Sequence, residues 1–171
     1  MIFLTVGTTK FPFNRLLETV DGAIRDLGIK EDLVAQIGKS DYGFQYKNTE
    51  VYEEIAFDKM ISYLKRARII VTPAGPATIL LALEYGRYKP LIVPRLKEFG
   101  EHVGDHQLFF ARALKKENIG KVFLGESGLQ EVIKGYFLKP EKKKITKKDD
   151  LSKNNLVRRL IDFTEKLDGK K

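Results

Sequence analysis

The chain has 171 residues, 43% of them hydrophobic, with no cysteine and a formal net charge of +8. This length and composition indicate one domain with a sizeable core, and the absence of cysteine excludes disulfides and thiolate metal sites. No apolar run approaches the roughly 20 residues that cross a bilayer. Arg15 and Glu18 interrupt the apolar residues near the start, so we expect no signal peptide.

Strand-like apolar runs alternate with segments of helical period along most of the chain. The strands are expected at residues 2–6, 32–38, 68–72, 90–94 and 121–125, with a short one inside 51–57. The helices are expected at residues 12–27, 57–67, 76–85, 105–116 and 128–134. This alternation is typical of an α/β fold with a doubly wound, Rossmann-like parallel sheet. Ligands of such sheets bind beyond the carboxyl ends of the strands, where three loops stand out.

The first loop is VGTTKFPFNR, which follows the first strand. Gly7 directly after a buried strand lets the backbone turn sharply and lets a ligand approach closely. Thr8 and Thr9 offer hydroxyl and N–H groups near the start of the next helix, where the helix dipole favours anions. The loop is not a GxGxxG dinucleotide fingerprint. It fits either a ligand contact or an ordinary turn.

The second loop lies in VTPAGPATILLALEYG, which indicates a buried strand, a tight turn and the start of a helix. Gly75 suits the N-cap, and Pro76 suits the first helical position, where a missing N–H is least harmful. The N–H groups of Ala77, Thr78 and Ile79 would then face an anion at the positive end of the helix. The pattern fits equally a phosphate cradle weakened by proline and a stiff turn without a ligand.

The third loop, VPRLKEFGEHVGDHQLFFARAL, contains both histidines of the chain. The i, i+4 spacing of His102 and His106 would suit a metal ion only if one helix ran through both. Gly104 and the capping character of Asp105 indicate that the helix starts near Asp105, so we expect no metal site. The acidic and amide side chains here, Gln107 among them, better suit hydrogen bonds to a polyol or a nucleotide sugar. The alternative is an ordinary polar loop with a helix cap.

The composition changes after residue 138. Residues 136–171 carry 12 Lys and Arg against 6 Asp and Glu, so this tail holds +6 of the net charge of +8. We expect a domain at residues 1–138, a basic linker at 139–150 and an amphipathic helix within 151–171. The tail could bind an anionic lipid surface, an acidic partner or nucleic acid, or it could be a solvated linker. The narrow apolar stripe of the helix, which lacks tryptophan, favours docking on the body or a partner over membrane contact.

The three loops together resemble a known family. MIFLTVGTTKFPFNRLLETVD, IIVTPAGPATILLALEYGRYKPLIVPR and EFGEHVGDHQLFFARAL resemble segments of the small soluble donor-binding subunit of split lipid-linked-sugar glycosyltransferases. In eukaryotes that subunit makes the second N-acetylglucosamine linkage of dolichol-linked chitobiose, and its bacterial relatives act in polysaccharide assembly. The resemblance runs over residues 1–124. It implies the fold of the C-terminal half of a GT-B glycosyltransferase of family 28.

The resemblance also implies a function and a set of site residues. The chain would be a hexosyltransferase subunit that binds a nucleotide-sugar donor, typically a UDP-sugar. A membrane-bound partner subunit would supply the lipid-linked acceptor, and transfer would invert the anomeric centre with no metal or other cofactor. The chain would be cytoplasmic, held at the membrane through that partner, inactive alone, and without a nucleic-acid partner. His102 is the candidate catalytic residue. By position, the donor-binding residues would be Gly7, Thr8, Thr9, Gly75, Thr78, Asp105, His106 and Gln107.

The central segment departs from the family's usual Ser-His-Ala-Gly-Ala-Gly-Thr-Ile-Leu-Glu. Pro73 stands in place of the histidine, and Pro76 and Ala77 stand in place of a small residue and the second glycine. Leu81 replaces the glutamate that commonly holds the ribose hydroxyls; Glu84, one helical turn later, could substitute as a donor-binding residue. Losing that carboxylate would weaken donor binding by on the order of a few kcal/mol. The alternative function is therefore a non-catalytic partner subunit that keeps the fold and has lost donor binding.

Overall fold

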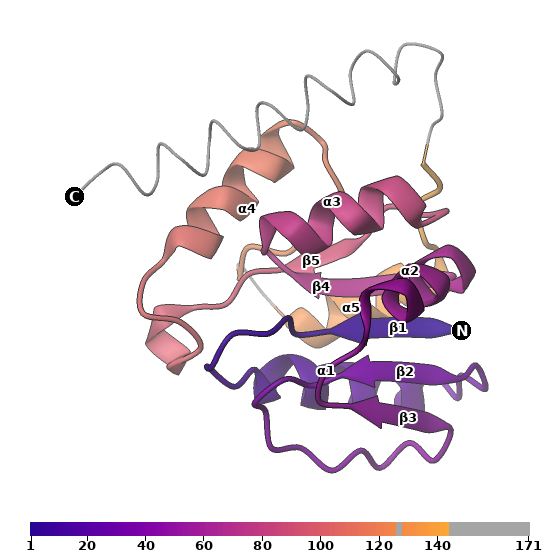
Figure 1. Cartoon of the computed structure of the whole chain (residues 1–171). Helices are drawn as coiled ribbons and strands as arrows, with labels where there is room; N and C mark the ends of the chain where they lie inside the picture. Colours follow the sequence, from indigo (N-terminus) through magenta and orange to yellow (C-terminus); the bar gives the residue numbers. More distant parts are fainter. Residues whose placement is uncertain (126–127, 144–171) are drawn as a thin grey trace.

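The computed structural model describes residues 1–125 and 128–143. At its centre lies a sheet of six parallel strands in the order β3-β2-β1-β4-β5-β6 (Figure 1). The strands are β1 (Ile2–Thr5), β2 (Leu33–Gln36), β3 (Thr49–Tyr52), β4 (Ile69–Pro73), β5 (Leu91–Val93) and β6 (Lys121–Val122). This order confirms the predicted doubly wound, Rossmann-like sheet. The chain adds β2 and β3 on one side of β1 and then returns to place β4 on the other side, so the strand order reverses between β1 and β4.

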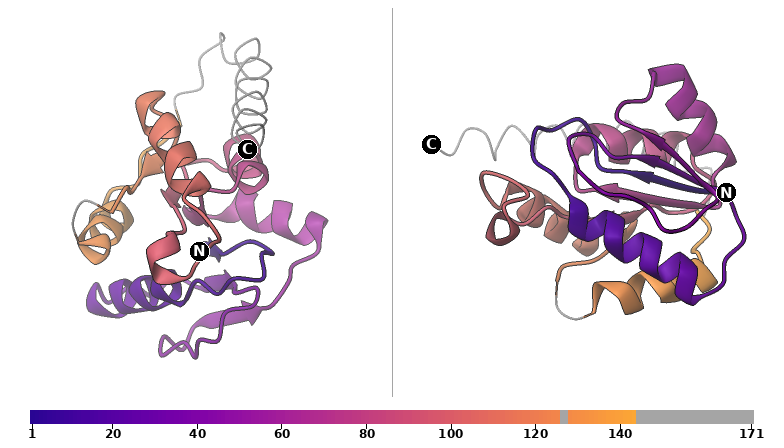
Figure 2. Two further views of the ribbon diagram at one scale, coloured as in Figure 1. Left: turned by 90° about the vertical axis from the view of Figure 1, so that its left-hand side faces the viewer. Right: turned by 90° about the horizontal axis from the view of Figure 1, so that it is seen from below.

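Helices cover both faces of this sheet (Figures 1 and 2). One face carries α1 (Asn14–Asp26) and α5 (Leu129–Leu138), and the other carries α2 (Phe57–Arg66), α3 (Pro76–Tyr85) and α4 (His106–Lys116). Successive residues of a strand point to opposite faces: Ile2 and Leu4 belong to the cluster beneath α1 and α5, and Phe3 belongs to the cluster beneath α2 and α3. The central strands are therefore apolar at almost every position, as buried parallel strands require.

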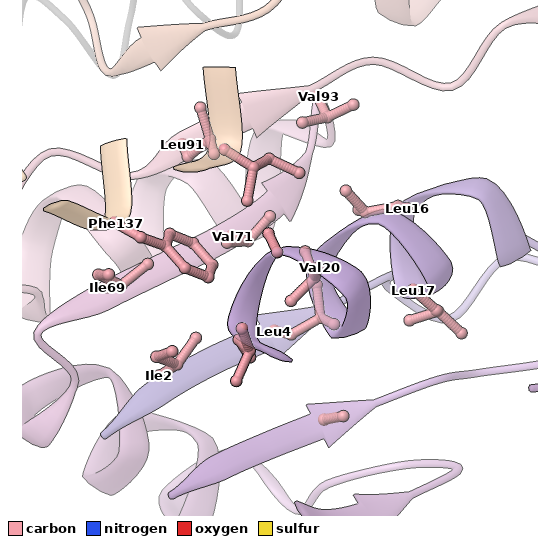
Figure 3. Close-up of a cluster of buried hydrophobic side chains, with 14 of the residues drawn as sticks. Ile2, Leu4, Leu16, Leu17, Val20, Ile69, Val71, Leu91, Val93 and Phe137 are labelled. Atoms are coloured by element: carbon pink, nitrogen blue, oxygen red, sulfur yellow. The ribbon is translucent and has the colours of Figure 1, made fainter. Parts of the chain in front are cut away.

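The largest cluster of buried hydrophobic residues lies between α1, α5 and the central strands (Figure 3). Leu16, Leu17 and Val20 form the inner stripe of α1 and are fully buried against the sheet. From the neighbouring helix, Phe137 packs beside Ile69 of β4. Burying each such side chain stabilises the fold by roughly 1.5–3 kcal/mol. The strands are thus fixed firmly, and the loops at their carboxyl ends start from rigid elements.

Several predicted boundaries differ from the structure: the sixth strand, for example, ends at Val122 and not at residue 125, and two other differences have a clear physical reason. The third strand was expected inside residues 51–57, but it occupies Thr49–Tyr52, since the backbone there pairs in parallel register with β2 and the Leu33 N–H donates to the Asn48 carbonyl at 2.9 Å. The last predicted helix, 128–134, extends to Leu138 as α5, because Tyr136 and Phe137 are buried in the core. Packing therefore decided both boundaries.

The expected linker and tail helix lie mostly outside the described residues. Of the expected linker, residues 139–143 are described, and they run beside the segment between α3 and β5. The Lys89 N–H donates to the Glu141 carbonyl at 2.9 Å, and Tyr88 and Lys142 form an isolated antiparallel bridge. This short stretch is therefore bonded to the body. The amphipathic helix expected within 151–171 stays a prediction.

Candidate functional site

The loops that follow β1, β4 and β5 meet at the carboxyl edge of the sheet, which faces the viewer in the left panel of Figure 2. The first loop lies close to the end of β4, where the second loop begins: a Cβ placed on Gly7 would lie 3.9 Å from Pro73 Cγ. Since β1 and β4 flank the point where the strand order reverses, Gly7 lies where ligands bind in sheets of this type. The edge is therefore the candidate site.

The first loop turns through a left-handed glycine. Gly7 has φ +76°, a conformation that favours glycine. The loop after β2 packs against it, because a Cβ on Gly38 would lie only 2.8 Å from the Gly7 carbonyl oxygen. Thr8 is exposed, whereas Thr9 is half-buried and its hydroxyl oxygen accepts the Phe11 N–H at 3.2 Å. Of the two predicted threonines, only Thr8 is thus fully open to solvent.

The second loop ends in the amino terminus of α3, as predicted. Gly75 is the N-cap and Pro76 the first helical residue. The prediction that Ile79 offers a free N–H is wrong, because this group donates to the Gly75 carbonyl at 3.1 Å. The N–H groups of Ala77 and Thr78 precede that first helical bond and remain available at the positive end of the dipole. This end of the helix can hold a small anion through two backbone donors.

Glu84 lies at the opposite end of α3 from this terminus. It is the penultimate residue of the helix and is exposed, and helix geometry separates it from Thr78 by roughly 9 Å along the axis. Leu81, which occupies the place of the family's glutamate, is half-buried and packs against the core cluster beneath α2 and α3. A role for Glu84 at the ribose stays a prediction, and it would require the ligand to extend along α3.

The third loop brings the two histidines together beside the first loop. The His102 and His106 ring centroids are 6.4 Å apart, and the His102 ring lies 5.8 Å from the ring of Phe11. His102 is half-buried and its Nδ1 accepts the Gly104 N–H at 3.3 Å, while His106 is exposed. The helix starts at His106, with Asp105 as the N-cap residue, as predicted. The histidines of the third loop thus lie next to Phe11 of the first loop.

Asp105 and Gln107 bond to the backbone of their own loop. The Gln107 side-chain oxygen accepts the Arg95 N–H at 3.1 Å, and an Asp105 carboxylate oxygen accepts the Lys97 N–H at 3.4 Å. Asp105 makes no side-chain capping bond to α4. Gln107 is buried, so it shapes the loop as it stands. Donor contacts from either residue stay a prediction.

Arg95 ties the third loop to the first, and sequence reasoning did not identify it. It is fully buried, and its guanidinium donates to the carbonyls of Phe11 and Pro12 at 2.9 Å each and of Glu101 at 3.2 Å. A further bond of 2.7 Å joins it to the Val6 carbonyl. Burial lowers the pKa of Arg95 to about 10, so the group stays charged at neutral pH. In the sequence, the one sign of this structural role was the position of the arginine directly after an apolar strand.

A second ionic contact lies next to Arg95. Glu101, 3% exposed, accepts two hydrogen bonds of 2.8 Å from Arg15 and one of 2.9 Å from the Leu96 N–H. The Arg15 guanidinium also lies 4.9 Å from the ring of Phe99. The bidentate geometry joins α1 to the third loop. Together with Arg95, it holds the loops after β1 and β5 in one fixed arrangement.

This arrangement, a doubly wound sheet with three connected loops at its carboxyl edge, accompanies a family match. Residues 1–161 match the glycosyltransferase family 28 C-terminal domain. The chain belongs to this family. Its fold is accordingly that of a GT-B C-terminal domain, and it is a glycosyltransferase domain of the type that binds the sugar donor. A comparison with curated proteins found no match.

Two features are absent from residues 1–125 and 128–143. Over these ranges, none of the helices has both the length and the apolar character needed to cross a bilayer. Over the same ranges, no group of three or more His, Asp or Glu side chains is arranged to hold a metal ion.

Proposed function

We propose that this chain binds a nucleotide-sugar donor, in the first instance a UDP-sugar, as one subunit of a hexosyltransferase with a lipid-linked acceptor. Family membership supports the general part, a glycosyltransferase domain for the sugar donor. The resemblance of the loops to split lipid-linked-sugar glycosyltransferases supports the rest. The observation that carries the proposal is the connection of the three loops at one sheet edge, with Gly7 beside Pro73 and Arg95 bonded to Val6.

In this proposal the donor diphosphate lies at the amino end of α3. The N–H groups of Ala77 and Thr78 and the helix dipole would stabilise its negative charge as it leaves. Gly7 would permit close approach of the ligand to the backbone. His106, exposed at the start of α4, would donate to hydroxyls of the sugar, and His102 beside it is the candidate for the catalytic role.

A membrane-bound partner subunit would supply the acceptor half of the active site. The chain corresponds to one half of a GT-B enzyme, so the lone subunit should bind donor but transfer no sugar. Transfer would invert the anomeric centre, and the chain would act in the cytoplasm at the membrane through its partner. These statements rest on the resemblance and are tested with the reconstituted pair.

The first experiment is a thermal-shift panel on the full chain with UDP, UDP-N-acetylglucosamine, UDP-glucose, GDP-mannose and dTDP-glucose. A selective rise in melting temperature with one nucleotide supports the proposal, since a ligand that binds only the folded state stabilises it by mass action. His106→Ala should reduce the rise without lowering the melting temperature of the free chain, because this side chain is exposed. Asp32→Ala, at the opposite edge of the sheet, is the matched control. No shift with any nucleotide, alone or with the co-expressed partner, would contradict the proposal.

One observation favours a second function, that of a non-catalytic subunit which has lost donor binding. The amino end of α3 has a proline at its first position, which removes one N–H donor, and Leu81, in the place of the family's glutamate, is apolar. The two functions differ in turnover. Sugar transfer by the reconstituted pair that is abolished by His106→Ala, with Asp32→Ala unaffected, would exclude the non-catalytic subunit.

A further inference from the structure

Side chains hold both polar groups of the peptide bond between Val6 and Gly7. The Val6 carbonyl accepts a hydrogen bond from Arg95 Nη2 at 2.7 Å. The Gly7 N–H donates to Thr5 Oγ1 at 3.1 Å, and the Thr5 hydroxyl donates to Gln36 Oε1 at 2.6 Å. Because its proton is committed to Gln36, the Thr5 oxygen presents a lone pair to the Gly7 N–H. We call Thr5, Gln36 and Arg95 the peptide clamp.

The peptide clamp is buried at an energetic cost. Thr5 and Arg95 are 0% exposed and Gln36 is 1% exposed. Within residues 1–125 and 128–143, the two buried side-chain nitrogens without a hydrogen-bond partner are Gln36 Nε2 and Arg95 Nε. Buried donors without acceptors destabilise a fold. Gln36 and Arg95 each keep one unpaired buried nitrogen, and their other polar atoms support the first loop. Arg95 bonds to that loop directly, and Gln36 acts through its hydrogen bond with Thr5.

The clamped peptide has little freedom to rotate. Gly7 is in the left-handed region, and Gly38 packs against the peptide that follows, since a Cβ on Gly38 would lie 2.8 Å from the Gly7 carbonyl oxygen. Rotating the peptide would break the bonds to Thr5 and from Arg95 together and leave a partly buried N–H and a buried C=O unpaired. Arg95 also holds two later carbonyls of the loop, at residues 11 and 12. One cation thus fixes the course of the loop from residue 6 to residue 12.

We propose that the peptide clamp positions the first loop for donor binding, and that Thr5, Gln36 and Arg95 act on the ligand only through the backbone of this loop, with the Val6–Gly7 peptide at its start. That the ligand is a nucleotide sugar rests on the proposed function. The existence of the peptide clamp rests only on the hydrogen bonds described above. Thr5 and Gln36 come from β1 and β2, and Arg95 comes from the loop after β5. The clamp therefore sets the first loop relative to the third.

The test compares Thr5→Val, which keeps the shape and removes the hydroxyl, with Thr5→Ser, which keeps the hydroxyl. Gly7 amide hydrogen exchange is measured by NMR on the full chain without ligand, and the Kd is measured for the nucleotide selected in the thermal panel. Thr5→Val should speed Gly7 exchange and raise the Kd, each by about tenfold, which is the worth of one hydrogen bond in an equilibrium. Thr5→Ser should stay close to wild type in both. Arg95→Lys, which keeps the charge but lacks the planar fork, should act like Thr5→Val.

Ile24→Val is the control for general destabilisation, because Ile24 is buried in α1 away from the carboxyl edge. Unchanged Gly7 exchange in Thr5→Val would overturn the clamp. Faster exchange with an unchanged Kd, or an equal rise of Kd in Ile24→Val, would overturn its positioning role. If the wild-type chain binds no nucleotide even with its partner, the proposed function fails, and Gly7 exchange still decides whether the clamp exists.

Discussion

Replacing Glu101 with glutamine tests whether the contact between α1 and the third loop stabilises the fold. The Glu101 side chain is 4% exposed and that of Arg15 is 24% exposed, and two bonds of 2.8 Å join them. Breaking a fully buried ion pair costs about 3–5 kcal/mol, and an exposed pair is worth under about 1 kcal/mol. Since Arg15 stays partly solvated, we expect Glu101→Gln to lower the free energy of unfolding by about 2–3 kcal/mol.

The assay is urea denaturation followed by far-ultraviolet circular dichroism, since the chain has no tryptophan to report by fluorescence. A loss of this size corresponds to a fall in melting temperature of about 5–10 °C for a chain of this length. Glu98→Gln is the matched control: it makes the same chemical change on the same loop at an exposed position. A double-mutant cycle with Arg15→Met should give a coupling energy of at least about 1 kcal/mol. Additive effects of the two changes, or a loss no larger than that of Glu98→Gln, would refute the reasoning.

Three other predictions concern stability and titration. Gly38→Ala should destabilise the fold by about 2 kcal/mol or more, because φ is +52° and the new Cβ would lie 2.8 Å from a carbonyl oxygen; Gly43→Ala, which meets nothing within 4 Å, should be nearly neutral by urea denaturation. The hydrogen bond from Arg68 holds the pKa of Glu31 below its usual value of 4.5, so its stabilisation is present above that pH and is lost as the pH falls through the lowered folded-state pKa. Glu31→Gln should therefore be less stable than wild type at pH 7, and the difference should shrink in acid; a constant difference from pH 7 to pH 3 would contradict this. Burial raises the pKa of Tyr42 to about 12 and also raises that of Tyr136, so ultraviolet titration should show late-ionising tyrosines, one fewer of them in Tyr42→Phe, and the stabilisation from Tyr42 should be lost between about pH 10 and 12.

The order of strands and helices was predictable because the buried strands of this sheet are continuous apolar runs. β4 and β5 read as IIVTP and LIV, and every residue in them is buried, so they are recognisable without knowledge of their neighbours. β3 reads as TEVY at the edge of the sheet, where two of its residues are exposed, and its position follows from pairing with β2. The bounds of β3 are therefore set by its hydrogen bonds to β2, and the pattern of its own residues does not define them.

The connections between the loops could not be predicted, because they join residues far apart in the sequence. Arg95 bonds to Val6, 89 positions earlier, and Glu101 bonds to Arg15, 86 positions earlier. In a linear sequence each looks like a charged residue of a solvated loop, since charged side chains are seldom fully buried. Gln107 was predicted as a donor contact for its polarity and for its position in the family resemblance; its side-chain oxygen accepts the Arg95 N–H, and the donor contact stays a prediction. The polar residues of the sequence indicated which loop lies at the candidate site. They did not show which side chains bond to the loop's own backbone and which are left to contact a ligand.

The three parts of the edge differ in how much each can contribute to a bound donor. The amino end of α3 lacks an N–H at Pro76, and the Ile79 N–H makes the first helical bond, to the Gly75 carbonyl, so Ala77 and Thr78 are the residues of this helix with N–H groups left for a diphosphate. The loops after β1 and β5, in contrast, are held by Arg95 and by the pair of Glu101 and Arg15. When few donors remain at the phosphates, the fixed placement of the other contacts matters more, because ordering mobile loops on binding subtracts from the affinity. In the proposed donor site, α3 would therefore supply partial positive charge, and the two tied loops would supply most of the contacts to the sugar.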